Sequence, residues 1–180
     1  MPKNTVEIEM NLGPEAQEVS YAKYAKQREW DIYYLNMARY VSIKSKDPST
    51  QTGAVIVRPD KSVASIGFNG FPKGMQDTPE LYADREKKYS RTVHCEVNAQ
   101  IFTREDLTGC TLYTWPFASC DRCAVQMIQA GISRFVFPEM PAEKAARWKD
   151  IMELAESYML EAGREVVKIH HTEIPDVVLK

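Results

Sequence analysis

The chain has 180 residues, of which 44% are hydrophobic and 27% are charged, and its formal net charge is −2. This composition predicts a globular protein with one core of ordinary size. The near-neutral charge disfavours a broad nucleic-acid-binding surface, which needs a basic excess. No apolar run approaches the roughly 20 residues of a membrane helix, and the first residues lack the apolar core of a signal peptide.

The four cysteines include a C-x-x-C pair, Cys120 and Cys123. In a chain of this size, metal binding explains such a pair better than a disulfide does. We therefore expect the protein to work in a reducing compartment, the cytoplasm.

The first predicted helix starts at Glu29 and ends before Asp47. Its apolar residues follow the i, i+3, i+4 spacing of one helical face, which we interpret as core packing: Trp30, Tyr33, Tyr34, Met37 and Val41. The residues before this helix are polar and lack a clear period. We expect residues 1–28 to form an N-terminal arm, residues 29–170 a single domain and residues 171–180 a tail.

Two short apolar runs, residues 53–57 and 63–68, predict strands. The turn chemistry between them, Arg58-Pro59-Asp60-Lys61, predicts an antiparallel hairpin. A glycine-rich segment and then a polar, charged stretch follow, up to about Thr92. They predict a long loop, which in a compact domain is usually functional or mobile.

The remaining chain predicts alternating helices and strands: a helix over 95–102, a strand over 111–114, a helix over 120–130 closed by Gly131, a strand over 134–137, a helix over 141–162 and a strand over 165–169. The last helix is expected to bury Trp148, Ile151, Met152, Ala155 and Met159. A crossover of that length joins parallel strands. The predicted fold is α/β, with a mixed five-stranded sheet whose last two strands are parallel and whose two faces are covered by helices.

The strongest chemical signal combines His94, Cys120 and Cys123 with the nearby carboxylate Glu96. One imidazole and two thiols supply three zinc ligands, which leaves the fourth position open, as in catalytic zinc sites. Each half of the motif lies at the start of a predicted helix, whose partial positive charge favours thiolates. Because residues two apart point to nearly opposite sides of a helix, we expect His94 to precede the first regular turn.

Zinc bound by two thiolates and a neutral imidazole is formally neutral, so it acidifies water less than zinc held by three imidazoles. A general base is then valuable, and Glu96 is the candidate. Proton transfer from water and back to a leaving group suits deamination of an aminopyrimidine or aminopurine ring. H-x-E followed by C-x-x-C is the signature of the zinc deaminases.

The resemblance extends beyond these ligands to five segments: Gly53-Ala-Val-Ile-Val57, Gly67-Phe-Asn-Gly-Phe-Pro72, His94-Cys-Glu-Val-Asn-Ala99, Cys120-Asp-Arg-Cys-Ala124 and Gln129-Ala-Gly-Ile132. Together they resemble the deoxycytidylate (dCMP) deaminases of the cytidine deaminase superfamily, over about residues 30–169. The resemblance implies the three-layer α-β-α fold of that superfamily. It also implies hydrolysis of dCMP to dUMP and ammonia, which supplies nucleotides for dTMP synthesis.

By the same resemblance, His94, Cys120 and Cys123 bind Zn²⁺ and Glu96 transfers protons. The substrate-binding residues it implies are Asn69 on the deoxyribose, the Cys95 N–H on the ring carbonyl, a carbonyl of the 117–119 loop (Ala118 or Ser119) on the amino group, and Asn98. It further implies a site for dCTP (activator) or dTTP (inhibitor), with Mg²⁺, near Phe68, Asn69, Gly70 and Phe71. Family members of this type are commonly hexamers.

Three positions depart from the family pattern. Ser119 stands where proline usually precedes the first zinc cysteine, and the loop before Cys120 is one residue longer than usual. Cys95 replaces the usual alanine. The partner of the 5′-phosphate is open among Arg85, Lys87, Lys88 and Arg91.

Two other functions stay open. One is an RNA- or nucleoside-specific adenosine or cytosine deaminase of the same superfamily, which the near-neutral charge disfavours. The other is a non-catalytic, nucleotide-sensing oligomer, which would have no need of Glu96.

Overall fold

The computed structural model describes residues 14–140 and 148–175. Its elements in chain order are α2 (Pro14–Ser42), β1 (Gly53–Val57), β2 (Val63–Phe68), α3 (Pro79–Ala83), α4 (Arg85–Arg91), α5 (Cys95–Phe102), β3 (Thr111–Trp115), α6 (Asp121–Gln129), β4 (Arg134–Pro138), α8 (Lys149–Glu161), β5 (Glu165–Ile169) and the 3-10 helix η1 (His171–Glu173). Within those two ranges, no helix combines the length and apolar character needed to span a bilayer.

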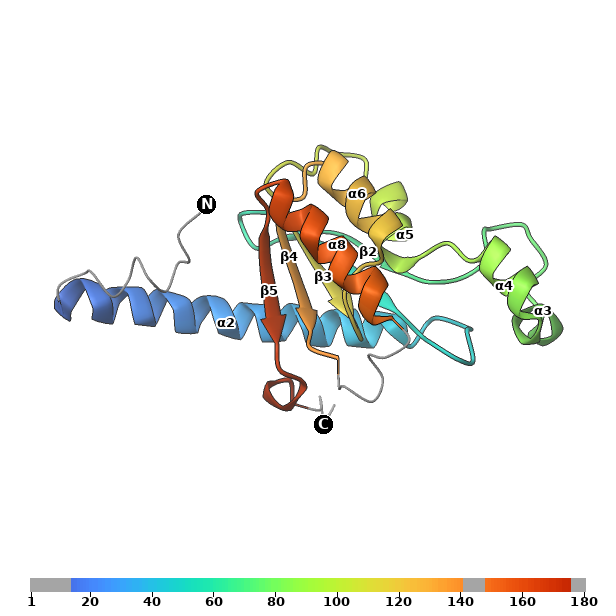
Figure 1. The fold of residues 1–180 in the computed structure, drawn as a ribbon, viewed down its shortest axis with the longest axis horizontal. Coiled ribbons are helices and arrows are strands. Elements are labelled where there is room, and N and C mark those ends of the chain that lie inside the picture. Colours follow the sequence, from blue (N-terminus) through green and yellow to red (C-terminus); the bar gives the residue numbers. More distant parts are fainter. Residues whose placement is uncertain (1–13, 141–147, 176–180) are drawn as a thin grey trace.

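The strands form one sheet in the order β2-β1-β3-β4-β5 (Figure 1). β1 pairs antiparallel with β2 and with β3, whereas β3, β4 and β5 are parallel to one another. The predicted hairpin, the predicted parallel pair at the end of the chain and the mixed five-stranded sheet are confirmed.

Helices cover both faces of this sheet because its central strands are apolar on both sides. Every residue of β1 is buried. Val55 and Val57 pack with α2 on one face, and Ala54 and Ile56 pack on the other face with residues of α5, α6 and α8. Alternate strand residues point to opposite faces, so a fully apolar strand needs two covering layers. The three-layer α-β-α fold is confirmed.

Helix α2 begins fifteen residues earlier than predicted, at Pro14 instead of Glu29. Residues 14–28 are rich in Ala, Glu, Gln and Lys, which are strong helix formers, but they carry no apolar stripe. Hydrophobic periodicity therefore misses them. The first turns of α2 extend past β5 (Figure 1). Within the predicted stripe, Tyr33 is 54% exposed, so its placement in the core was wrong.

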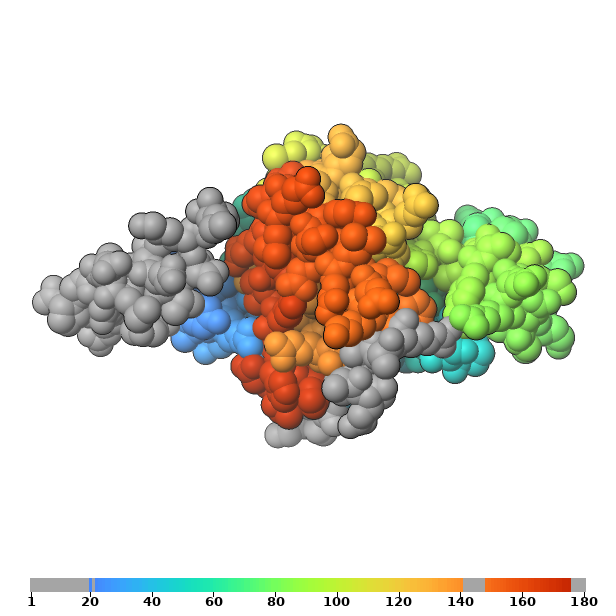
Figure 2. Space-filling model, in the orientation of Figure 1, coloured from blue at the N-terminus to red at the C-terminus, as the bar shows by residue number. Residues whose placement is uncertain are grey.

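The predicted loop before Thr92 contains two short helices, α3 and α4. Asp84 caps α4, because its carboxylate accepts a hydrogen bond from the Lys87 N–H at 3.1 Å. The two helices form a lobe that stands off from the body (Figure 2). The buried ion pair between Lys88 and Asp47, with 3.0 Å from Nζ to Oδ1, joins the lobe to the loop after α2.

Helix α8 confirms most of the predicted buried stripe, although residues 141–147 lie outside the described ranges. Ala155 and Met159 are fully buried and Met152 is half-buried. Ile151 is 38% exposed, so its assignment to the buried side was wrong. A residue adjacent to Met152 is turned by about 100° around the helix and leaves the buried face. Beyond β5, Ile174 of the expected tail is buried in the core on the α2 side.

A buried ion pair fastens α2 to the sheet. The Arg134 guanidinium donates two hydrogen bonds to the Asp31 carboxylate, at 2.7 and 2.8 Å, and Asp31 is only 2% exposed. The Tyr113 hydroxyl donates a third to Asp31 at 2.8 Å. Burial, followed by the charge of Asp31, raises the pKa of Tyr113, so this hydroxyl stays protonated. The network joins α2, β3 and β4.

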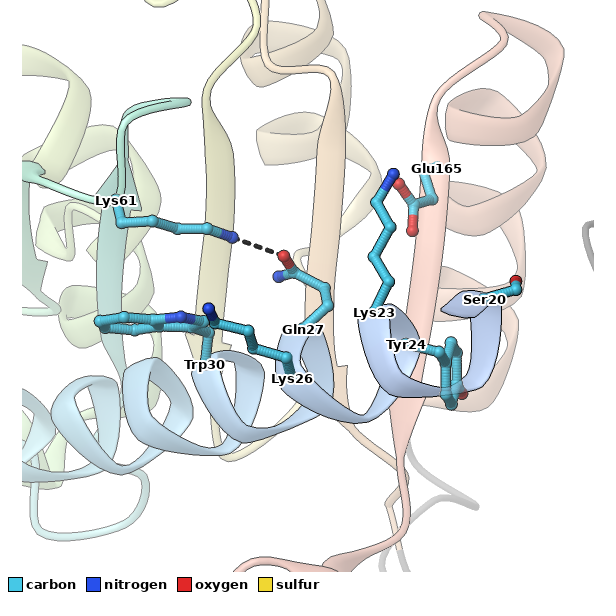
Figure 3. A pocket seen from close by; sticks show the side chains of 8 residues that line it. All are labelled: Ser20, Lys23, Tyr24, Lys26, Gln27, Trp30, Lys61 and Glu165. Atoms are coloured by element: carbon cyan, nitrogen blue, oxygen red, sulfur yellow. Dashed lines mark hydrogen bonds between the residues drawn. The ribbon is translucent and has the colours of Figure 1, made fainter. Parts of the chain in front are cut away.

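The outer partners of this network line a pocket of about 470 Å³ (Figure 3). The Gln27 amide donates to Asp31 and accepts from the Lys61 ammonium, and Glu165 accepts from Arg134 at 2.9 Å. The full lining is Ser20, Lys23, Tyr24, Lys26, Gln27, Trp30, Lys61 and Glu165. None of the predicted zinc, substrate or effector residues is part of it.

We predict that Arg134→Met lowers the free energy of unfolding by about 3–5 kcal/mol, because it leaves the Asp31 carboxylate buried without a counter-charge. Urea denaturation followed by circular dichroism measures this loss. Glu165→Gln is the matched control. The Glu165 side chain is 62% exposed, so removing its charge should cost less than about 1 kcal/mol. Equal losses in the two variants would contradict the assigned role of the buried pair.

Candidate metal centre

His94 lies at the N-cap of α5, with extended backbone angles of φ −72° and ψ 157°. It therefore precedes the first helical turn, as the spacing of His94 and Glu96 requires. The preceding residue, Val93, forms an isolated antiparallel bridge with Gly70, with N–O distances of 2.9 and 3.1 Å. This bridge ties the entry of α5 to the loop after β2.

Gly67 allows α5 to lie directly on β2. A Cβ atom at this position would come within 2.3 Å of the Cys95 carbonyl oxygen and 2.4 Å of the Ala99 nitrogen. Both contacts are with backbone, which cannot rotate away as a side chain can. Glycine in β2 therefore determines how deeply the start of α5 is set into the fold.

Helix α6 begins in the same way at Cys120, its N-cap residue (φ −71°, ψ 167°). The Cys120 sulfur accepts a hydrogen bond from the Cys123 N–H at 3.5 Å, so this thiol caps the helix. Cys123 lies in the first turn and is buried. The free N–H groups and the dipole at a helix N-terminus favour the thiolate form of both cysteines.

The two helix starts bring three ligand atoms together. His94 Nδ1 lies 3.5 Å from the Cys120 sulfur and 3.4 Å from the Cys123 sulfur. All three ligand atoms lie within 4.8 Å of one another. A tetrahedral zinc ion with Zn–S of about 2.3 Å and Zn–N of about 2.0 Å separates its sulfur and nitrogen ligands by about 3.5 Å. The donor set and its spacing therefore fit zinc.

The protonation of these ligands follows their contacts. The hydrogen bond from the Cys123 thiol lowers the pKa of Cys120 to about 4, helped by His94 and opposed by burial. The same hydrogen bond, followed by burial, raises the pKa of Cys123. The hydrogen bond with Cys120 raises the pKa of His94. Zinc binding releases such protons, so zinc affinity falls at acidic pH.

Glu96 is a spare carboxylate beside these ligands. It lies in the first turn of α5, is only 4% exposed, and its charge raises the pKa of both His94 and Cys123. Its Oε2 accepts a hydrogen bond from the Cys95 thiol at 3.1 Å. His94 is exposed, so solvent reaches the cluster from that side. This arrangement suits a base that acts on a metal-activated water.

The predicted substrate residues Asn69 and Asn98 both make structural hydrogen bonds. The Asn69 carbonyl accepts from the Thr52 N–H at 2.8 Å, and its amide donates to the Thr50 carbonyl at 3.0 Å. The Asn98 amide donates to the Phe68 carbonyl at 2.7 Å and so links α5 to β2. Their roles toward substrate stay predictions.

The loop predicted to bind an effector supports the entry to α5. Gly70 pairs with the residue before His94, and Phe71 stacks on Tyr82 of α3 with ring centroids 4.3 Å apart. Phe68 is 41% exposed. The loop therefore contacts both the residue that leads into α5 and the α3–α4 lobe.

In the loop before α6, Ala118 and Ser119 are buried next to Cys120. The Phe117 carbonyl already accepts a hydrogen bond from the Thr114 hydroxyl at 2.8 Å. The carbonyls of Ala118 and Ser119 are therefore the better candidates for an amino group. The Ser119 hydroxyl is buried and has no hydrogen-bond partner in the described part of the chain.

The four basic phosphate candidates differ in their contacts. Lys88 is buried against Asp47, and Lys87 pairs with Asp84 at 2.8 Å. The Arg85 guanidinium lies over the Tyr89 ring, and Arg91 donates to the Lys87 carbonyl at 3.3 Å. The pairing with carboxylates makes the two lysines the weaker candidates.

Sequence reasoning overlooked Thr52, which lies beside Cys95 and is held by Asn69. The available signal was a polar residue directly before the fully buried strand β1. That position precedes an interior strand of the sheet, and the sequence alone does not show that α5 begins beside it.

Comparison with known proteins places this site in a family. The family described as the cytidine and deoxycytidylate deaminase zinc-binding region matches residues 28–139. An uncharacterised deaminase from the luxG 3′ region of Aliivibrio fischeri is 39% identical over 138 residues, covering 77% of this chain and 92% of the relative. Human deoxycytidylate deaminase is 37% identical over 128 residues, covering 67% and 70%.

The fold agrees with solved structures. The dCMP deaminase of cyanophage S-TIM5, in complex with dCMP and dUMP, superposes with a TM-score of 0.61 at 22% identity, covering 88% of this chain and all of that one. The family match over residues 28–139 spans β1 to β4 and includes His94, Cys120, Cys123 and Glu96. The chain therefore belongs to the family of cytidine and deoxycytidylate deaminases with a zinc-binding region.

Proposed function

We propose that this protein hydrolyses dCMP to dUMP and ammonia. The observation that carries the proposal is the cluster of His94, Cys120 and Cys123 with the buried Glu96 carboxylate beside it. The names of the relatives support dCMP as substrate, since human deoxycytidylate deaminase is among them and the cyanophage enzyme was solved with dCMP and dUMP.

Zinc, when bound, supplies a Lewis acid that lowers the pKa of a water molecule. Glu96 would accept one proton of the water and pass it to the ring nitrogen as the water oxygen adds to the ring carbon. It would then take the second proton from that oxygen and pass it to the amino group, which leaves as ammonia. The water oxygen replaces the amino nitrogen on the ring carbon, so dCMP and water become dUMP and ammonia. The same carboxylate serves each proton transfer.

The remaining residues would hold the nucleotide. The Cys95 N–H is in the first turn of α5, where amides lack helical acceptors, so it can bind the ring carbonyl. A carbonyl of Ala118 or Ser119 would accept from the amino group. Asn69 and Asn98 would face the deoxyribose side. Two of the four cysteines belong to the metal cluster, which supports a reducing, cytoplasmic location.

We predict that Glu96→Ala abolishes ammonia release from dCMP while zinc stays bound. Acid–base catalysis by one group typically contributes about 10²–10⁴-fold, and the loss should exceed this range because Glu96 acts in several steps. Ammonia assays with dCMP, dCTP, cytidine and cytosine, together with zinc analysis by mass spectrometry, test both parts.

Cys123→Ala is the matched control, since it should lose both zinc and activity. Cys110→Ala removes a buried cysteine outside the cluster and should keep both. Normal turnover by Glu96→Ala would overturn the mechanism. Deamination of a tRNA loop but not of dCMP would indicate the RNA-directed alternative, and no turnover of any substrate by zinc-loaded native protein would indicate the non-catalytic one.

We also propose that dCTP activates and dTTP inhibits the enzyme, with Mg²⁺, at the loop of Phe68, Asn69, Gly70 and Phe71. The support is positional. Gly70 of this loop pairs with Val93, the residue before His94, and Phe71 stacks on Tyr82 of α3. A ligand bound to the loop could therefore change the position of the start of α5. Such regulation needs a ligand that binds two states with different affinities.

We predict that dCTP and dTTP shift the dCMP saturation curve in opposite directions and that Phe71→Ala weakens both shifts. Removing this ring takes away the stack on Tyr82 without touching a zinc ligand. Tyr89→Ala, in the same lobe, controls for general loosening. A native curve that neither triphosphate moves would refute the regulatory site and leave the deaminase activity untouched.

We further propose that the chain forms a homo-oligomer, a hexamer by family resemblance. Strand β2 is at the edge of the sheet and contacts α5, and both carry exposed apolar side chains: Ile66 (49%), Phe68 (41%), Ile101 (62%) and Phe102 (72%). Neighbouring exposed apolar residues of this kind are typical of contact surfaces between subunits.

We predict a solution mass several times the 20.6 kDa of one chain, and a smaller mass for Phe102→Asp. A charge at an interface core is costly to desolvate. Light scattering coupled to size-exclusion chromatography gives both masses. Tyr40→Asp places the same charge on the exposed side of α2 and should leave the mass unchanged. A monomeric native chain would contradict the proposal.

A further inference from the structure

The Cys95 side chain is in direct contact with the proposed proton carrier. Its sulfur lies 3.1 Å from Oε2 of Glu96, and the two side chains are only 3% and 4% exposed. A thiol is a weak donor and a carboxylate accepts only, so the S–H donates and Oε2 accepts.

Thr52 lies beside the Cys95 thiol. The backbone of Thr52 is fixed by Asn69, since the Thr52 N–H donates to the side-chain Oδ1 of Asn69 at 2.8 Å and the Thr52 carbonyl accepts from the backbone N–H of Asn69 at 3.2 Å. Asn69 is 5% exposed. The contacts run from Asn69 through Thr52 and Cys95 to Glu96.

A carboxylate that carries protons between water and substrate needs a defined orientation. The terminal torsion of a glutamate is roughly two-fold, so either oxygen can face the substrate. Misplacing a catalytic group by about 1 Å can lower the rate about 100-fold. With Oε2 occupied by the thiol, Oε1 is the oxygen left for the water and the ring. The zinc ligands do not provide this restraint, because none of them is hydrogen-bonded to Glu96 in the described part of the structure.

We infer that Cys95 is a positioning residue for catalysis: its S–H holds Glu96 by Oε2 so that Oε1 faces the reacting atoms. The inference rests on the proposed function, since it assigns Glu96 the proton transfers. It concerns the side chain of Cys95 and is separate from any role of its backbone N–H.

A packing role is the competing explanation, since Cys95 belongs to the apolar core on the α5 side of the sheet. Serine and alanine at position 95 separate the two roles. They are close in size, and both leave a similar gap in the core, but serine keeps a donor. Cys110→Ala removes a buried thiol from the same core cluster at a site away from Glu96.

In zinc-loaded full-length protein, we expect Cys95→Ala to lower kcat for dCMP about three- to tenfold, the effect of one hydrogen bond, with KM within twofold of native. Cys95→Ser should recover most of that loss, and Cys110→Ala should leave kcat unchanged.

A second measurement does not depend on turnover. The S–H stretching band of Cys95, identified in infrared difference spectra by its loss in Cys95→Ala, should move to higher wavenumber in Glu96→Ala. A hydrogen bond to the carboxylate lowers the S–H stretching frequency, so removing the carboxylate raises it.

Native kcat in Cys95→Ala, equal losses in the serine and alanine variants, or an unshifted S–H band would each overturn the inference. A native chain inactive on dCMP would instead refute the proposed function, so the two failures are distinguishable.

Discussion

The metal centre depends on one constraint, that two helices begin at the same place. The ligand atoms of His94, Cys120 and Cys123 lie within 4.8 Å of one another only because the N-caps of α5 and α6 converge. Both N-cap residues have extended backbone, so the loops that lead into α5 and α6 set the positions of His94 and Cys120. Gly67 lets α5 come that close, since any side chain there would collide with backbone.

The buried ion pair and the metal cluster lie on opposite faces of the sheet. On the α2 face, Asp31 and Arg134 form a buried, bidentate ion pair whose partners come from α2 and β4. Such a pair costs desolvation and is most damaging when only one member is removed. On the opposite face, the polar groups of α5 and α6 converge on the zinc ligands. Changes to one face can therefore be measured largely apart from the other.

Several residues near the centre hold its backbone in place. Asn69 clamps the backbone at Thr50 and Thr52, Asn98 joins α5 to β2, and Gly70 pairs with Val93. These contacts hold the residues around the start of α5 in place whether or not a nucleotide is present. A substitution at Asn69 or Asn98 therefore changes the shape of the site as well as any contact with substrate, which is why Cys95 is the cleaner position at which to study the orientation of Glu96.

The sequence by itself determined the features that depend on short spacing. H-x-E and C-x-x-C predicted the cluster of His94, Cys120 and Cys123 and the carboxylate beside it. The apolar runs with Arg58-Pro59 between them predicted the hairpin. The length of the last crossover predicted the parallel pair β4–β5. Each of these depends on neighbours within one or two turns or on chain length, so local chemistry is sufficient.

Local patterns failed where burial is set by distant partners. The first half of α2 consists of helix-forming residues without an apolar stripe, so hydrophobic periodicity did not predict it. Tyr33 and Ile151 are each adjacent in sequence to a residue on the packed face of their helix, and they point away from that face. The tertiary structure alone decided that Lys88 pairs with Asp47, 41 residues away, and Arg134 with Asp31, 103 residues away. It also decided that Thr52 and Cys95 meet beside Glu96. These contacts follow from the order of strands and the packing of helices on them, which no short segment of the chain contains.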